Sequence, residues 1–221
     1  MIKVLPSTNP CPEDKLLDYT KMLMEMDVEY LHCDVMDGKF VENKCLDFSV
    51  VEKIRNNTNI LLDVHLMVEN VFESVKKFAK LKPNFITIHY EALKSTKEFE
   101  KVVKFLRKKD ILIGLSIRPN TPIEIVERFL KQIALIFIMS VEPAKSGQKF
   151  IENSLEIIKN TKQLIGDNRV IIEVDGGINE ENAKSVINAG AEFLVMGSAF
   201  YNSKDKQELL HSIDKHYKKS K

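Results

Sequence analysis

The chain has 221 residues, a length that one α/β barrel fills as a single domain, although two small domains would also fit. Its 32 acidic and 33 basic side chains nearly cancel, so no overall field favours nucleic acid or an anionic membrane as a partner. Hydrophobic residues make up 44% of the chain, enough for a large core, and the low Gly and Pro counts give no sign of a fibrous or disordered protein.

The three cysteines, Cys11, Cys33 and Cys45, are odd in number and form no CxxC pair. They therefore indicate neither a disulfide framework nor a thiolate zinc site, and they fit a reducing cytosol. The first residues, Met-Ile-Lys-Val-Leu-Pro, lack the long apolar stretch of a signal peptide, and no segment approaches the ~20 apolar residues of a membrane span. We expect a cytoplasmic protein that binds no membrane.

Short β-rich segments recur along the chain and predict eight strands, at residues 2–5, 29–36, 60–67, 84–89, 111–117, 133–141, 170–175 and 193–196. Segments with helical periodicity and many Lys and Glu side chains follow them and predict eight helices, at residues 13–26, 48–55, 71–80, 96–109, 123–131, 153–164, 180–189 and 204–217. No linker or low-complexity block interrupts this order, so we expect a single domain over residues 1–221.

Strict alternation of strand and helix is typical of a parallel sheet with right-handed crossovers, and eight such units close into a barrel. The rival fold is an open doubly wound sheet, which would normally carry a Gly-rich fingerprint after its first strand. Here that turn reads Ser7-Thr8-Asn9-Pro10 instead. The sequence therefore predicts a single (β/α)8 TIM barrel.

Candidate metal ligands occur where a barrel places its catalytic groups, at the carboxyl ends of the strands. In the second strand, alternation puts His32 and Asp34 on one face. If that face points inward, Cys33 packs beneath the helices as an ordinary buried thiol. The third strand brings His65 to the same rim, and the seventh strand ends in Asp175.

Two histidines and two carboxylates at one rim form a ligand set suited to Zn²⁺, Fe²⁺, Mn²⁺ or Co²⁺. A lone histidine at a strand end fits a hydrogen-bonded core residue better. Burial of two carboxylates, however, costs several kcal/mol unless a cation pairs them. We therefore predict one divalent metal ion per subunit, held by His32, Asp34, His65 and Asp175.

A metal flanked by two carboxylates suits proton abstraction next to a carbonyl, because the ion can hold the negative charge that develops on the enediolate oxygens. If Asp34 and Asp175 lie on opposite faces of a bound sugar, one removes a proton while the other supplies one, and the carbon is inverted. The two carboxyl groups must then start in different protonation states.

Glycines follow the last two predicted strands, as Gly176-Gly177 and Gly197-Ser198, where barrels of this type commonly bind phosphate through backbone N–H groups. Either pair alone also fits a simple turn. The segment at residues 141–148 follows the sixth strand and is long enough to act as a lid.

Three methionines, Met36, Met67 and Met139, fall near the rim on different strands. They are either plain core residues or an apolar collar that keeps water from the enediolate. Glu173 shares a strand face with Asp175, so we expect it to point inward one layer lower, where it needs a partner that the sequence does not name.

Specific motifs occur at most of the predicted strand ends: PS at 6–7, HCDVMDGKFV at 32–41, DVHLMV at 63–68, HYE at 89–91, VEP at 141–143, GQKF at 147–150, VDGGI at 174–178 and GSA at 197–199. With these motifs the chain resembles the ribulose-phosphate 3-epimerase family from the first strand to the last. The resemblance implies a barrel of the ribulose-phosphate-binding type that interconverts D-ribulose 5-phosphate and D-xylulose 5-phosphate.

The resemblance also implies roles for individual residues. The family's metal ligands correspond to His32, Asp34, His65 and Asp175, with Asp34 and Asp175 as the acid–base pair. Ser7 and His65 would contact the substrate, and its phosphate would be surrounded by Gly147, Gly176, Gly177, Gly197 and Ser198. Because the family is usually oligomeric, the resemblance further implies a homodimer or homohexamer.

Three stretches depart from the family pattern. Ser7 is followed by Thr8-Asn9-Pro10-Cys11-Pro12 where the family has a turn like Ile-Leu-Ser-Ala-Asp, and Glu42 replaces a usual proline. The lid lacks two glycines of the family's Pro-Gly-x-Gly-Gly-Gln, since Ala144, Lys145 and Ser146 precede Gly147.

These departures keep two alternatives open. One is the same 3-epimerisation on a six-carbon ketose phosphate such as allulose 6-phosphate, and the other is a non-catalytic barrel descendant. Retention of all four candidate ligands argues against the second. Metal-free decarboxylase barrels with an Asp-x-Lys-x-x-Asp motif are disfavoured, because Asp63-Val64-His65 lacks that lysine.

Overall fold

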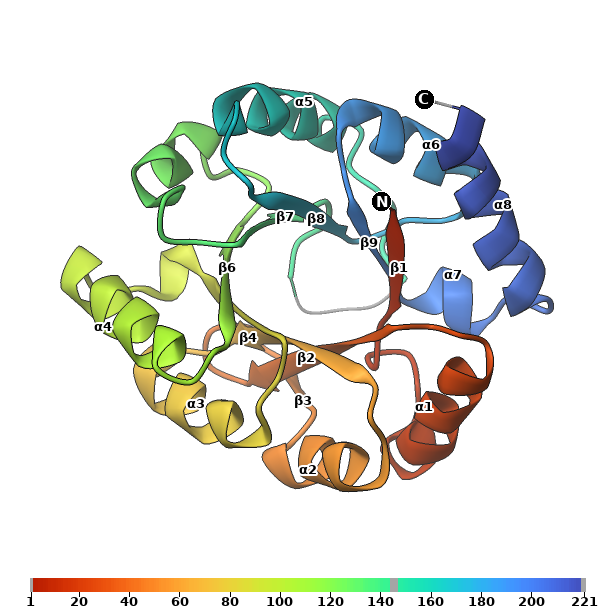
Figure 1. Cartoon of the computed structure of the whole chain (residues 1–221), viewed down its shortest axis with the longest axis horizontal. Coiled ribbons are helices and arrows are strands. Elements are labelled where there is room, and N and C mark those ends of the chain that lie inside the picture. Colours follow the sequence, from red (N-terminus) through yellow and green to blue (C-terminus); the bar gives the residue numbers. More distant parts are fainter. Residues whose placement is uncertain (1, 144–146, 220–221) are drawn as a thin grey trace.

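The computed structural model of the chain describes residues 2–143 and 147–219. Nine strands run through this part (Figure 1): β1 (Lys3–Pro6), β2 (Tyr30–Asp37), β3 (Lys44–Cys45), β4 (Leu61–Met67), β5 (Phe85–His89), β6 (Leu112–Ile117), β7 (Leu135–Met139), β8 (Ile171–Asp175) and β9 (Phe193–Met196).

Helices follow the strands and surround them: α1 (Leu16–Glu25), α2 (Phe48–Asn57), α3 (Val71–Phe78), α4 (Thr96–Arg107), α5 (Ser154–Ile165), α6 (Glu180–Ala189), α7 (Ser198–Tyr201) and α8 (Lys206–Lys219). Four 3-10 helices add to them: η1 (Glu13–Lys15), η2 (Ala79–Leu81), η3 (Tyr90–Ala92) and η4 (Ile123–Phe129). None of the helices in the described ranges has both the length and the hydropathy needed to cross a membrane.

The strands form one sheet in the order β1-β9-β8-β7-β6-β5-β4-β2-β3, and every pair is parallel except β2–β3. A backbone bridge between Ser7 and His32 joins β1 to β2, and the Thr8 N–H donates to the His32 carbonyl at 2.9 Å. The sheet therefore curls into the ring of strands seen in Figure 1, with the helices outside it. The predicted (β/α)8 barrel is confirmed.

Alternation along the strands separates two apolar layers. The outer face packs against the helices in one large cluster, which includes Cys33 as a fully buried thiol, as predicted. A smaller cluster fills the inside of the barrel and includes Leu5, Phe85, Phe137 and Phe193. Inward-pointing polar side chains at the strand ends therefore lie on an apolar base.

Some elements differ from the sequence prediction. The α-helix predicted at residues 123–131 is wrong, because η4 is a 3-10 helix. Its buried residues are Ile123, Val126 and Phe129, a spacing of three that matches the three residues per turn of a 3-10 helix. The elements β3 and α7 were not predicted, since two residues and a single turn are too short to show a hydrophobic period.

A matched pair of strand leucines tests the outer core. Leu62 on β4 is fully buried, whereas Leu112 at the start of β6 is 49% exposed. Leu62→Ala should lower the free energy of unfolding by about 2–5 kcal/mol, because it leaves a cavity under the helices. Leu112→Ala should change it by about 0.5 kcal/mol or less. Urea denaturation measures both values, and equal losses would contradict the buried position of Leu62.

Candidate metal centre and active site

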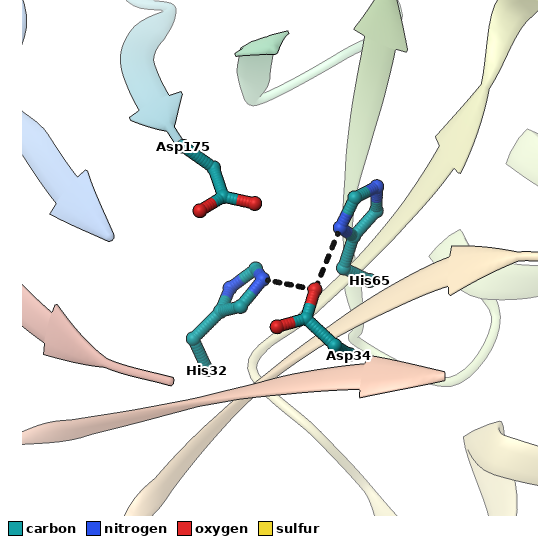
Figure 2. Close-up of side chains that lie close together, drawn as sticks. All are labelled: His32, Asp34, His65 and Asp175. Atoms are coloured by element: carbon teal, nitrogen blue, oxygen red, sulfur yellow. Dashed lines mark hydrogen bonds and ion pairs between the residues drawn. The ribbon is translucent and has the colours of Figure 1, made fainter. Parts of the chain in front are cut away.

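Four polar side chains at the carboxyl ends of three strands converge on one point (Figure 2). His32 and Asp34 come from β2, His65 from β4 and Asp175 from β8. Each offers one ligand atom, and these four atoms all lie within 4.8 Å of one another. The parallel register of β2 and β4 brings about part of this convergence, because it pairs Asp34 directly with His65. The structure thus brings together all four side chains that the sequence singled out as metal ligands.

Asp34 is at the centre of these contacts. Its Oδ1 lies 3.2 Å from His32 Nε2 and 3.3 Å from His65 Nδ1. Its Oδ2 accepts a hydrogen bond of 2.7 Å from the hydroxyl of Ser7, so the residue expected to contact substrate also orients this carboxylate. Two imidazole nitrogens and two carboxylates around one point fit a divalent transition metal.

The two carboxylates of the site are in different electrostatic surroundings. Burial would raise the pKa of Asp34, but the charge of His32 and hydrogen bonds with both histidines hold that pKa well below its usual range. Burial, and then the charge of Asp34, raise the pKa of Asp175 to about 7. Before a cation binds, Asp34 is therefore ionised, whereas Asp175 is partly protonated at neutral pH.

A second polar layer lies beneath the first and orients His32. Asp63 Oδ2 lies 2.5 Å from His32 Nδ1, and Glu173 Oε1 lies 3.5 Å from the same nitrogen. If Nδ1 donates to Asp63, the Nε2 of His32 presents its lone pair to the shared point, as second-layer carboxylates commonly arrange for metal-binding imidazoles. Sequence reasoning missed Asp63, although its position two residues before His65 placed it on the inward face.

The partners of Glu173 that the sequence did not name are His32 and Asp63. Glu173 points inward beneath Asp175, as expected, and is fully buried beside His32 and Asp63. Burial, and then the charge of Asp63, raise the pKa of the Glu173 carboxyl well above its usual range. A neutral Glu173 removes one negative charge from an interior that already contains the carboxylates of Asp34, Asp63 and Asp175.

Phe137 on β7 forms an apolar platform beneath both imidazoles. Its ring centroid lies 4.3 Å from that of His65 and 5.5 Å from that of His32. Phe137 is fully buried, so the polar cluster is closed off from below.

On the side of β5, His65 contacts a further imidazole. His65 Nε2 lies 2.8 Å from His89 Nε2, and His89 Nδ1 lies 3.3 Å from Glu91 Oε2. Burial would raise the pKa of Glu91, but hydrogen bonds with His89, the Arg118 backbone N–H and Thr121 lower it to about 2. In the sequence these residues stood out only as part of a family motif, with no role attached.

A cavity of about 700 Å³ opens above this cluster. It is lined by both carboxylates of the site and by every predicted substrate-contacting residue except the buried His65, namely Ser7, Met36, Met67, Met139, Gly147, Gly176, Gly177, Gly197 and Ser198. Met36 and Met67 pack with Val41 in a small apolar cluster at the rim, whereas Met139 belongs to the inner barrel core. The methionines therefore take part in both core packing and the cavity wall.

The turn after β8 packs tightly against residues at the start of the lid and just after it. Gly176 and Gly177 have positive φ angles of 121° and 65°. A Cβ on Gly176 would lie 2.4 Å from the Val141 side chain, and one on Gly177 would lie 2.3 Å from the Phe150 backbone nitrogen. Only glycine fits both positions.

The lid is described at its two ends. The Gln148 side-chain amide donates to the Glu142 carbonyl at 2.6 Å, which ties these ends together. Ala144, Lys145 and Ser146, whose effect on phosphate closure was left open, lie outside the described residues.

Comparison with known proteins decides the family. Residues 3–201 match the model of the Ribulose-phosphate 3 epimerase family. The chain belongs to this family. The ribulose-phosphate 3-epimerase of Bacillus subtilis (strain 168) is 35% identical over 216 residues, which cover 96% of this chain and 98% of that protein. The chloroplastic ribulose-5-phosphate-3-epimerase of Arabidopsis thaliana is also 35% identical, over 96% of this chain and 76% of its own length.

Solved structures of other enzymes share the fold of this epimerase-family chain. A 3-hexulose-6-phosphate synthase superimposes with a TM-score of 0.73 at 14% identity, over 97% of this chain and 99% of that one. The thiamine phosphate pyrophosphorylase of Pyrococcus furiosus gives a TM-score of 0.67 at 16% identity, over 99% and 96% of the two chains. At these identities the likeness shows the barrel fold alone.

Asp63→Asn tests whether the lower layer orients His32 in this family member. The amide lacks the charge that favours a proton on His32 Nδ1, so the zinc affinity should fall roughly 10- to 100-fold. Competition with a chromogenic chelator measures the affinity, and Asp47→Asn, at an exposed carboxylate, should leave it unchanged. Full zinc affinity in Asp63→Asn would show that His32 does not need this partner.

Proposed function

We propose that the chain is a metal-dependent 3-epimerase that interconverts D-ribulose 5-phosphate and D-xylulose 5-phosphate, a step of the pentose phosphate pathway. Membership of the ribulose-phosphate 3-epimerase family supports the reaction class. The observation that carries the proposal is the pair Asp34 and Asp175, which come from β2 and β8, point toward one another (Figure 2) and line one cavity.

One divalent metal ion per subunit fits this site. His32, Asp34, His65 and Asp175 would hold it, since their ligand atoms already share one point. When bound, the ion supplies positive charge that stabilises the enediolate oxygens of the substrate. Zn²⁺, Fe²⁺, Mn²⁺ and Co²⁺ all suit this set of two imidazoles and two carboxylates.

The two carboxylates perform the proton transfers at C3. Asp34 is fixed by Ser7 and approached by both imidazoles, a setting that favours the ionised form able to accept a proton. Asp175 reaches the cavity from another strand and can deliver a proton to the opposite face of the planar carbon. The roles exchange in the reverse reaction, and the configuration at C3 is inverted in both directions.

The phosphate end of the substrate binds at the glycine turns. Gly176 and Gly177 after β8, Gly197 and Ser198 after β9, and Gly147 at the lid all line the same cavity. A glycine exposes its backbone N–H without a side chain above it, so these turns can surround phosphate oxygens closely.

The apolar part of the wall protects the intermediate. Met36, Met67 and Met139 line the cavity beside the carboxylates. They exclude water from the enediolate, which would otherwise be protonated by solvent. The protein acts on a phosphorylated ketose as a cytoplasmic homo-oligomer, dimer or hexamer, and binds neither nucleic acid nor membrane.

A coupled assay with two substrates tests the function. With Fe²⁺, Mn²⁺, Co²⁺ and Zn²⁺ supplied in turn, ribulose 5-phosphate should be epimerised with a higher kcat/KM than allulose 6-phosphate. Faster turnover of allulose 6-phosphate would show that the six-carbon sugar is the preferred substrate. Inactivity on both sugars with metal bound would favour a non-catalytic barrel.

Loss of either carboxylate should stop the chemistry. Asp34→Asn and Asp175→Asn should each reduce epimerisation of ribulose 5-phosphate by roughly 10²- to 10⁴-fold, the usual contribution of a general acid or base. Nuclear magnetic resonance of the recovered sugar measures the conversion to xylulose 5-phosphate, with metal content determined for each variant. Epimerisation that persists in both metal-loaded variants would refute the two-carboxylate assignment.

A further inference from the structure

We propose that Glu91 is a positioning residue that fixes the tautomers of two imidazoles in series, so that His65 turns an unprotonated Nδ1 toward the metal centre. The inference rests on the metal-binding part of the proposed function. It concerns residues outside the four ligands, because Glu91 reaches His65 only through His89.

The contacts form a continuous buried row. Asp34 Oδ1 lies 3.3 Å from His65 Nδ1, His65 Nε2 lies 2.8 Å from His89 Nε2, and His89 Nδ1 lies 3.3 Å from Glu91 Oε2. Both imidazoles are fully buried, with ring centroids 4.9 Å apart and an interplanar angle of 29°. Each ring nitrogen therefore faces a specific group in the protein.

Proton counting restricts the possible arrangements. Two neutral imidazoles carry two N–H protons between them, but the row has three gaps: Asp34 to His65, His65 to His89, and His89 to Glu91. An empty middle gap would place two nitrogen lone pairs 2.8 Å apart, which is repulsive. The empty gap is thus at one end of the row, beside either Asp34 or Glu91.

The two ends compete, and only one outcome permits metal binding. If His89 Nδ1–H donates to Glu91, His65 Nε2–H donates to His89, and His65 Nδ1 is left with a free lone pair. In the opposite arrangement His65 Nδ1 carries the proton toward Asp34 and cannot ligate a metal. Ionised Asp34 and ionised Glu91 each attract a proton to their own end of the row, and a cation bound at Asp34 and His65 Nδ1 decides the competition. Glu91 permits that binding because its carboxylate accepts the proton that His89 Nδ1 must then carry.

Glu91 is itself held in this orientation. Its Oε1 accepts a 2.8 Å hydrogen bond from the Arg118 backbone N–H and a second one from the hydroxyl of Thr121, which leaves Oε2 for His89. The Arg118 guanidinium lies 4.5 Å from the centre of the Phe40 ring and donates to the Phe40 carbonyl at 3.2 Å. The Phe40 ring in turn contacts His89, with centroids 4.9 Å apart.

Glu91→Gln should reverse the direction of the hydrogen bonds along the row. The Arg118 N–H still needs an acceptor, so the amide oxygen stays on that side and the NH₂ group faces His89 Nδ1. His89 must then accept at Nδ1 and carry its proton on Nε2, which forces the His65 proton onto Nδ1. Long-range ¹H–¹⁵N spectra show directly which ring nitrogen carries the proton. Loss of packing alone would not move that proton from one nitrogen to the other.

With zinc bound, we expect wild-type protein to show His89 protonated on Nδ1 and Glu91→Gln to show it on Nε2. The zinc affinity of Glu91→Gln should fall roughly 10- to 100-fold, as for other residues that orient metal ligands. Glu100→Gln, at an exposed glutamate on α4, is the matched control and should retain both properties. Wild-type tautomers and wild-type zinc affinity in Glu91→Gln would overturn the proposal.

A second pair of variants keeps the test available if Glu91→Gln does not fold. His89→Gln offers a carbonyl that can accept from His65 Nε2–H, whereas His89→Leu offers no acceptor. Zinc should bind more tightly to His89→Gln than to His89→Leu, and equal affinities would also overturn the proposal. Neither measurement uses a sugar, so an inactive protein with these tautomers would contradict the epimerase function without affecting the role of Glu91.

Discussion

The structure depends on one electrostatic constraint, the burial of several carboxylates beside imidazoles at the mouth of the barrel. Asp34, Asp63 and Glu173 are almost fully buried, and Asp175 points into the same region. Unpaired charges in such surroundings destabilise a fold by several kcal/mol each, so they must share protons or a cation. A single divalent ion between Asp34 and Asp175, with a neutral Glu173 below, would satisfy this requirement.

The barrel provides the geometry through strand register. Pairing of β2 with β4 puts His32 beside Asp63 and Asp34 beside His65, so that a ligand layer lies directly above a layer that orients it. Phe137 closes the barrel beneath the imidazoles, and the glycine turns after β8 and β9 surround the opposite end of the cavity. The proposed proton transfer and phosphate binding would therefore take place at different sides of one opening.

Much of this arrangement follows from local sequence patterns. Alternation of strand and helix predicted the barrel, and alternation within strands placed His32 and Asp34 on the inward face, with Cys33 outside. The 3-10 helix η4 was mistaken for an α-helix because seven residues with apolar positions three apart resemble either one. The contacts of Asp63 with His32 and of His89 with His65 could not be predicted, since they depend on the register and proximity of strands that are distant in sequence.

The central claim is that one cation binds between two imidazoles and two carboxylates. X-ray absorption spectroscopy of the zinc-loaded protein tests it most directly, because the spectrum reports the type of each ligand. The account predicts two imidazole nitrogens and carboxylate oxygens at about 2.0–2.2 Å from zinc. A sulfur ligand at about 2.3 Å, or fewer than two imidazoles, would contradict it.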